Sequence, residues 1–148
     1  MDRCSLIAIA EQLVPERPSL TEAVRAAVDD RWALAELTRG LRDAEVMEYI
    51  DWSDDPEMAR EALESLKFHP SSMSWDWWEE HEDDDDGDEA IERFLGLAGE
   101  QSRKHGVLLV ELELGGDGYL LGFVPTGSAK DLIKAESLTV VRRGWQGG

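Results

Sequence analysis

Residues 107–125 read VLLVELELGGDGYLLGFVP, two apolar runs joined by a glycine-rich connection. Glycine and aspartate accept the positive φ angles that a tight turn needs, so this composition between β-forming runs predicts a β-hairpin. Apolar side chains alternate along the first run and form one face: Leu108, Val110, Leu112 and Leu114. Glu111 and Glu113 are expected to turn the other face towards water. The hairpin is therefore the expected centre of the fold.

Amphipathic helices are expected ahead of the hairpin. Apolar residues at three-and-four spacing predict helices over 2–13 and 19–40. The second of these starts at a capping box, ends at a glycine and carries Trp32 on its buried face. Residues 43–52 suit a short helix or a strand, and we favour the helix. Asp55 followed by proline then predicts another helix start, because aspartate caps and proline suits the first helical position.

The last helix before the hairpin is expected to begin at Asp88 or Glu89 and to stop at Gly106. A short helix over 128–133 and a third strand over 138–141 are expected after the hairpin. About five helices with two or three late, adjacent strands predict the α+β class. The expected arrangement is helices packed on one face of a small antiparallel sheet built around the 107–125 hairpin. At 148 residues the chain is expected to be a single domain, 1–148.

Nothing in the composition suggests export or a membrane location. The N-terminal residues carry charges and lack the pattern of a signal peptide, and no run of about eighteen apolar residues is present. The single cysteine, Cys4, has no partner for a disulfide within the chain and is expected in the core. We therefore expect a cytoplasmic protein.

The negative charge is concentrated in the middle of the sequence. Residues 43–92 contain 20 acidic side chains and two bases, Arg60 and Lys67, a net charge of −18 that equals the formal charge of the whole protein. The other residues carry 13 acids and 13 bases. Nucleic acid is not an expected ligand, because the acidic region would repel phosphates. A basic protein is the expected partner.

Residues 71–89, SSMSWDWWEEHEDDDDGDE, place three tryptophans next to a run of acids without a base. Repulsion among the like charges predicts a solvated loop. The tryptophans fit two interpretations: they anchor the loop on the core, or they contact a partner, since aromatic side chains are enriched in interfaces. The candidate partner-binding residues are Trp75, Trp77, Trp78, Glu79, Glu80, Asp83, Asp84, Asp85 and Asp86.

The other motifs do not predict catalysis or a metal site. Residues 82–93 have the glycine of a calcium loop, but Arg93 stands where the bidentate glutamate is needed. The three histidines lack zinc-ligand spacing, no serine or cysteine lies in a nucleophile motif, and the hairpin glycines lack the lysine of a phosphate loop. We therefore expect no cofactor, no metal and no enzymatic activity.

Two short motifs resemble an uncharacterised bacterial family, domain of unknown function 6630. They are Asp51-Trp52 followed by Asp54-Asp55, and Gly116-Asp117-Gly118-Tyr119-Leu120 running into Phe123-Val124-Pro125. The resemblance covers roughly the second half of the chain and implies no activity. It implies that the Asp51-Trp52 segment belongs with Asp117 and Tyr119.

Two classes of function remain. The first is a non-enzymatic binding module whose acidic face engages a basic partner, with an immunity or inhibitor protein of a bacterial toxin system as its sharpest form. The alternative is a carboxylate enzyme or a small-ligand or divalent-cation protein that uses Asp51, Asp54, Asp117 and Tyr119. The alternative needs carboxylates that converge in a pocket with perturbed protonation, whereas a binding module needs them spread over an open face.

Overall fold

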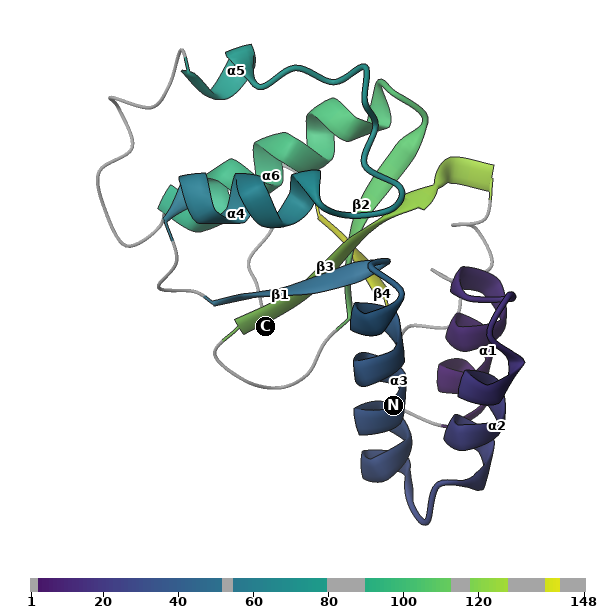
Figure 1. Cartoon of the computed structure of the whole chain (residues 1–148). Helices are drawn as coiled ribbons and strands as arrows, with labels where there is room; N and C mark the ends of the chain where they lie inside the picture. Colours follow the sequence, from purple (N-terminus) through teal and green to yellow (C-terminus); the bar gives the residue numbers. More distant parts are fainter. Residues whose placement is uncertain (1–2, 52–54, 80–89, 113–117, 128–137, 142–148) are drawn as a thin grey trace.

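The computed structural model of the chain describes residues 3–51, 55–79, 90–112, 118–127 and 138–141. Its helices are α1 (Arg3–Leu13), α2 (Pro18–Ala26), α3 (Asp30–Asp43), α4 (Pro56–Glu64), α5 (Asp76–Glu79) and α6 (Ala90–Arg103). Its strands are β1 (Met47–Asp51), β2 (Val107–Leu112), β3 (Gly118–Pro125) and β4 (Leu138–Val140). The α+β class is confirmed (Figure 1). None of the helices in these ranges combines the length and the apolar character that crossing a bilayer requires.

The hairpin forms as the sequence predicts. Strands β2 and β3 pair antiparallel, with Leu112 opposite Leu120. Strand β4 pairs with the other side of β2 and β1 with the other side of β3, which gives the order β1-β3-β2-β4. A Cβ atom at Gly122 would lie 2.4 Å from the carbonyl oxygen of Val46. Glycine at this position therefore lets the chain entering β1 approach β3 closely.

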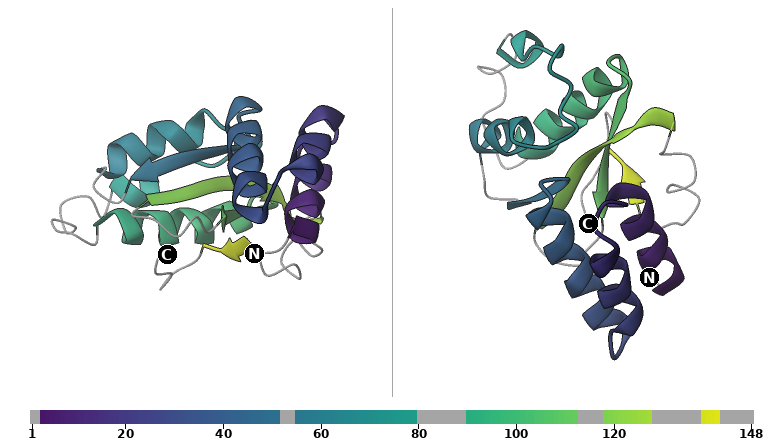
Figure 2. Two further views of the ribbon diagram at one scale, coloured as in Figure 1. Left: turned by 90° about the horizontal axis from the view of Figure 1, so that it is seen from below. Right: turned by 45° about the vertical axis from the view of Figure 1, so that its right-hand side comes forward.

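Helices cover both faces of the sheet, which corrects the prediction that they would pack on one face. Side chains of α1, α2 and α3 share a buried cluster with Val110 and Leu120. Side chains of α4 and α6 share a second cluster with Leu109 and Leu121, which point the opposite way from the same strands. Figure 2 shows α1, α2 and α3 grouped together, away from α4 and α6. Strands β2 and β3 carry apolar side chains on both faces because each face has its own helical layer.

The helix expected over 19–40 is two helices. Ala27 is extended at φ −60° and ψ 144°, which ends α2. Asp29 then begins α3, because its side chain accepts a hydrogen bond of 2.8 Å from the backbone N–H of Trp32. The break resets the helical phase, so Trp32 is 58% exposed instead of buried. The predicted capping box is not formed, since α2 starts at a proline without a side-chain cap.

Residues 43–52 form the end of α3 and strand β1 instead of the helix that we favoured. Gly40, the predicted helix stop, is a packing contact inside α3, because a Cβ atom there would lie 2.4 Å from Cδ1 of Leu20 in α2. The chain reverses after α3 at Glu45, whose φ of 59° is left-handed. Pairing with β3 then satisfies the backbone of β1, so tertiary contacts decide a sequence that local preference leaves ambiguous.

The buried faces of α1 and α6 agree with the predicted periodicity. In α1 they are Leu6, Ile9, Ala10 and Leu13, and in α6 they are Ile91, Phe94, Leu95 and Ala98. Cys4 is exposed on α1, which corrects its placement in the core. Gly106, the predicted stop after α6, has φ 85° and therefore takes the left-handed conformation that favours glycine. The short helix expected over 128–133 lies outside the described residues.

Candidate functional site

Trp75 and Trp78, two of the predicted contact residues, are in the core. Each is 6% exposed, and their rings lie 5.6 and 5.1 Å from the ring of Phe94 between centroids. Trp77 is half-buried against the same ring at 5.8 Å, and its indole Nε1 donates to the carbonyl oxygen of Ser74 at 2.6 Å. The anchoring interpretation therefore holds for Trp75 and Trp78, while Trp77 keeps surface that a partner could reach.

The acidic residues predicted beside the tryptophans lie mostly outside the described ranges. Glu79 is the last residue of α5, and Glu80 and residues 83–86 are not among those described. Within the described residues, the outer side of α4 is the clearest example of the acidic region. There Asp55, Glu57, Met58 and Glu61 are all exposed, and we call these four residues the α4 face.

The α4 face combines open negative charge with an apolar side chain. Glu57 and Glu61 lie one helical turn apart, so they project from the same side of α4. Met58 is 53% exposed beside them. Asp55 caps the helix by accepting a hydrogen bond of 2.9 Å from the backbone N–H of Met58. Among the described residues, no ion pair neutralises Glu57 or Glu61.

The single base of α4, Arg60, is directed away from this face. Its Nε lies 2.9 Å from Oε1 of Glu64, and its guanidinium stands 5.4 Å from the centre of the Trp75 ring. Arg60 therefore links α4 to the tryptophan cluster beneath it. The position of this base leaves the α4 face negative.

A second group of acidic side chains surrounds Tyr119. The pairing of β1 with β3 sets Asp51 opposite Gly118, the residue before Tyr119. The resemblance implied that the Asp51 segment and Tyr119 belong together, and the sheet register brings them together. Tyr119 is 6% exposed, and its hydroxyl donates to Oε1 of Glu92 in α6 at 3.3 Å.

The surroundings of Tyr119 disfavour its ionisation. Burial is the main cause that raises the pKa of Tyr119 to about 12, and the carboxylates of Glu92, Glu111 and Asp51 raise the pKa further because each opposes a negative phenolate. Glu111 is 4% exposed, which corrects the prediction that it faces water. The four consecutive apolar residues at 107–110 were the signal for a strand buried on both faces. No sequence motif singled out Glu92.

The remaining residues of the alternative ligand site, Asp54 and Asp117, lie outside the described residues. In the part of the chain that the structure describes, no three His, Cys, Asp or Glu side chains are grouped so that they could hold a metal ion. The described half of this site is therefore a buried tyrosine hydroxyl among carboxylates.

Ser72 and His105 form a contact that the sequence did not predict. The Oγ atom of Ser72 lies 2.7 Å from Nδ1 of His105, although 33 positions separate the two residues. A serine hydroxyl that is hydrogen-bonded to an imidazole nitrogen is one part of an activated nucleophile. Catalysis also needs a group that orients the histidine. Both side chains are exposed, and no hydrogen bond between described residues reaches the other ring nitrogen of His105. The pair is therefore a surface hydrogen bond.

Comparison with known families identifies the domain. A family model described as Domain of unknown function (DUF6630) matches residues 5–139. The chain belongs to the DUF6630 family. No curated protein and no solved structure matches it.

The extent of the match corrects the resemblance seen in the sequence, which covered only the second half of the chain. The DUF6630 region begins inside α1 and ends inside β4. The three N-terminal helices are therefore part of the family domain, and both helical layers belong to it. The α4 face, Trp77 and the Tyr119 group all lie within the matched residues.

Proposed function

We propose that this DUF6630 protein is a non-enzymatic binding module whose acidic face engages a basic protein partner. The observation that carries the proposal is the α4 face, where Glu57 and Glu61 stand exposed beside Met58 without a neutralising base among the described residues. The α4 face lies within residues 43–92, which hold the whole net charge of −18. Carboxylates spread over an open helix surface suit recognition of a partner better than catalysis.

Charge and apolar surface have separate roles in this proposal. The acidic residues attract a basic partner over distance, which can raise association rates by roughly 10 to 1000-fold at low salt. Met58 and the exposed part of Trp77 supply apolar contact area, which slows dissociation once the partner has docked. Trp75 and Trp78 serve the core and are not assigned to the contact.

The sharpest form of the proposal is an immunity or inhibitor protein of a bacterial toxin system. Such an inhibitor needs a rigid domain with an open, charge-complementary face, and it needs no chemistry of its own. The two helical layers on one sheet provide the rigid support, and α4 presents the acidic face at the surface. A basic toxin domain is the partner chemistry that this face fits.

The test is affinity capture from the native host with three forms of the protein. The forms are the wild type, Glu57→Gln/Glu61→Gln, and the control Glu11→Gln/Glu22→Gln, which removes the same charge from exposed positions on α1 and α2. We expect one basic protein to be retained by the wild type and the control and to be depleted with the α4 variant. Equal retention by all three forms, or a captured partner that is not basic, would contradict the proposal.

A second candidate function rests on the Tyr119 group. The carboxylate of Glu92 accepts from the buried hydroxyl of Tyr119, and Asp51 and Glu111 raise the pKa of that hydroxyl, which supports a small-ligand or divalent-cation site that would also draw on Asp54 and Asp117. Calorimetric titration with CaCl₂ and with MgCl₂ tests the cation form. Saturable binding that is lost in Asp51→Asn supports this function, and no heat beyond dilution for either salt rejects the cation form.

A further inference from the structure

Helix α3 carries a second exposed face, and the charge of this face is opposite to that of the α4 face. Its residues are Arg31, Trp32, Ala35, Arg39 and Arg42, all exposed, and we call them the α3 face. At 3.6 residues per turn these positions fall on one side of the helix, opposite the buried Ala33, Leu37 and Leu41. Three arginines on one helix side stand out in a protein whose formal charge is −18.

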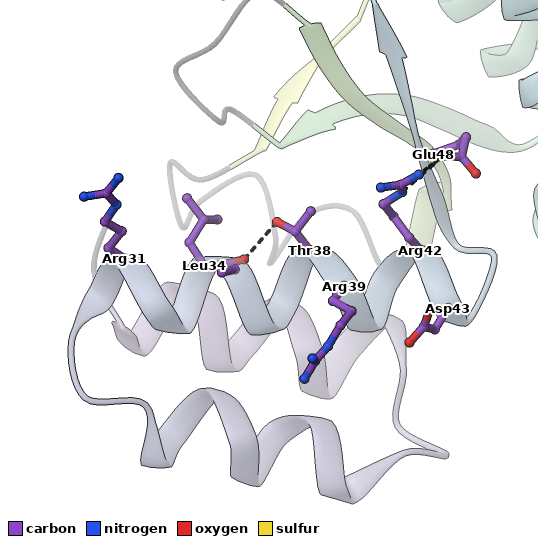
Figure 3. Close-up of a pocket in the computed structure, with 8 residues that line it drawn as sticks. Arg31, Leu34, Thr38, Arg39, Arg42, Asp43 and Glu48 are labelled. Carbon is purple, nitrogen blue, oxygen red and sulfur yellow. Dashed lines mark hydrogen bonds and ion pairs between the residues drawn. The ribbon is translucent and has the colours of Figure 1, made fainter.

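An open hollow of about 720 Å³ lies along this helix, and Trp32 stands outside it. Three bases and two acids are among its lining residues, which are Arg31, Leu34, Ala35, Thr38, Arg39, Arg42 and Asp43 of the α3 segment and Glu48 of β1. Figure 3 shows Arg31 and Arg42 at its two ends, with Leu34 and Thr38 projecting from the same side of α3 between them, while the side chain of Arg39 extends from the flank of the helix towards α2. The rise of 1.5 Å per residue places the two ends roughly 16 Å apart. This distance matches about five residues of an extended polypeptide at roughly 3.3 Å each.

The arginines of the α3 face are available to an incoming anion. Arg31 forms no ion pair with any described residue. Arg42 pairs with Glu48 at 3.1 Å and Arg39 with Glu36 at 2.5 Å, but both arginine side chains are more than half exposed. Surface ion pairs of this kind contribute only about 0–1 kcal/mol, so a partner's carboxylate can replace Glu36 or Glu48 at little cost.

Apolar side chains mark the end of the face where α3 begins. Trp32 is 58% exposed and Val28, in the turn before α3, is 81% exposed. This turn is at the end of the α2 and α3 pair that is farthest from the sheet (Figure 1). Tryptophan and arginine are the residue types that most often dominate binding energy in protein interfaces. An exposed tryptophan beside arginines therefore indicates an interaction surface.

We infer that the α3 face is a second docking site and that its occupant is an acidic polypeptide segment that carries an apolar side chain. Carboxylates of the segment pair with Arg31, Arg39 and Arg42, and its apolar side chain packs on Trp32. Ala35 leaves the centre of the face open for the backbone of the segment. The length of the face fits a short segment, whereas a long polyanion such as nucleic acid would extend beyond it towards the acidic region. The site uses a different helix and the opposite charge from the proposed function, so either can fail alone.

The experiment is a selection from a random library of displayed peptides with about ten positions, twice the span of the face in extended chain. The wild type is the bait, and the selected peptides are titrated against Arg31→Glu/Arg39→Glu, Trp32→Ala and a control, Arg103→Glu/Lys104→Glu. The control reverses the same number of exposed charges at the end of α6. We expect acidic peptides with an apolar residue, which bind the wild type and the control equally and both α3 variants at least about tenfold more weakly.

Several results would overturn the inference. One is the absence of enriched peptides, another is the enrichment of basic ones, and a third is equal affinity for all four proteins. Full displacement of the peptides by inorganic phosphate or free glutamate would assign the hollow to a small anion. A dimer in sedimentation that the Arg31→Glu/Arg39→Glu change dissolves would assign the face to a second copy of the chain. If Arg31→Glu/Arg39→Glu loses its thermal unfolding transition, Arg31→Gln/Arg39→Gln takes its place in the titrations.

Discussion

At the scale of single residues, the helices that cover each face of the sheet determine which side chains are buried. Tyr119 and Glu111 belong to strands that the sequence identifies correctly, but the sequence does not show that α6 covers their face. The same cause decides between the two interpretations of Trp75 and Trp78, which pack on Phe94 and anchor their segment on the core. Burial depends on contacts between distant segments, so a local pattern predicts the element better than the environment of its residues.

The first prediction concerns the ionisation of Tyr119. Folding raises its pKa from 10.0 to about 12, so the neutral phenol contributes stability that is fully present below pH 10.0 and is lost as the pH rises towards about 12. The chain has two tyrosines, so the ultraviolet titration of the wild type minus that of Tyr119→Phe isolates this group. We expect a midpoint near 12. A midpoint near 10.0 in the folded protein would show that the hydroxyl is solvated.

The second prediction separates the tryptophans by stability. Trp78→Ala should lower the free energy of unfolding by about 3–5 kcal/mol, because it removes a large buried ring beside Phe94. Trp77→Ala should cost clearly less, since its ring is half-buried. Chemical denaturation of the two variants measures both values. If the two costs were equal, Trp77 would be a core residue and would have to be removed from the proposed contact.

At the scale of elements, most helices and strands could be predicted from the sequence, and the exceptions have local causes. The faces of α1 and α6, the hairpin and the third strand follow from periodicity and turn composition. The break between α2 and α3 was missed because Asp29 is both a helix-compatible residue and a strong cap. Strand β1 was missed because its formation depends on pairing with β3, about seventy positions later in the chain.

The third prediction tests the central hairpin. Val110 is 1% exposed in the cluster under α1, α2 and α3, so Val110→Ala should lower the free energy of unfolding by about 1–3 kcal/mol. Val28→Ala is the matched control, since the same methyl groups are removed from a side chain that is 81% exposed. We expect the denaturation midpoint to fall for Val110→Ala and to stay within error for Val28→Ala. An unchanged midpoint for Val110→Ala would mean that this face of β2 is not buried.

At the scale of the whole molecule, charge is distributed by element. The α4 face is negative, the α3 face carries three arginines, and the sheet between their helical layers is mainly apolar on both sides, with Glu111 as a buried exception. Composition alone predicts the acidic region, because the count of acids in residues 43–92 needs no structure. The exposure of Met58 and the arginine side of α3 follow only from the arrangement of the helices, so the sequence could not predict either face completely.

The fourth prediction tests the central claim that the acidic face steers a basic partner. The measurement is the association rate constant of the captured partner at low and at high salt, for Glu57→Gln/Glu61→Gln and for Glu11→Gln/Glu22→Gln. Both pairs remove the same formal charge, but Glu11 and Glu22 stand beside Arg25, whereas Glu57 and Glu61 have no ion pair among the described residues. We predict that the α4 pair slows association several-fold at low salt and flattens its salt dependence, whereas the control pair changes neither by more than a small amount. Equal rates for the two variants at both salt concentrations would contradict the account.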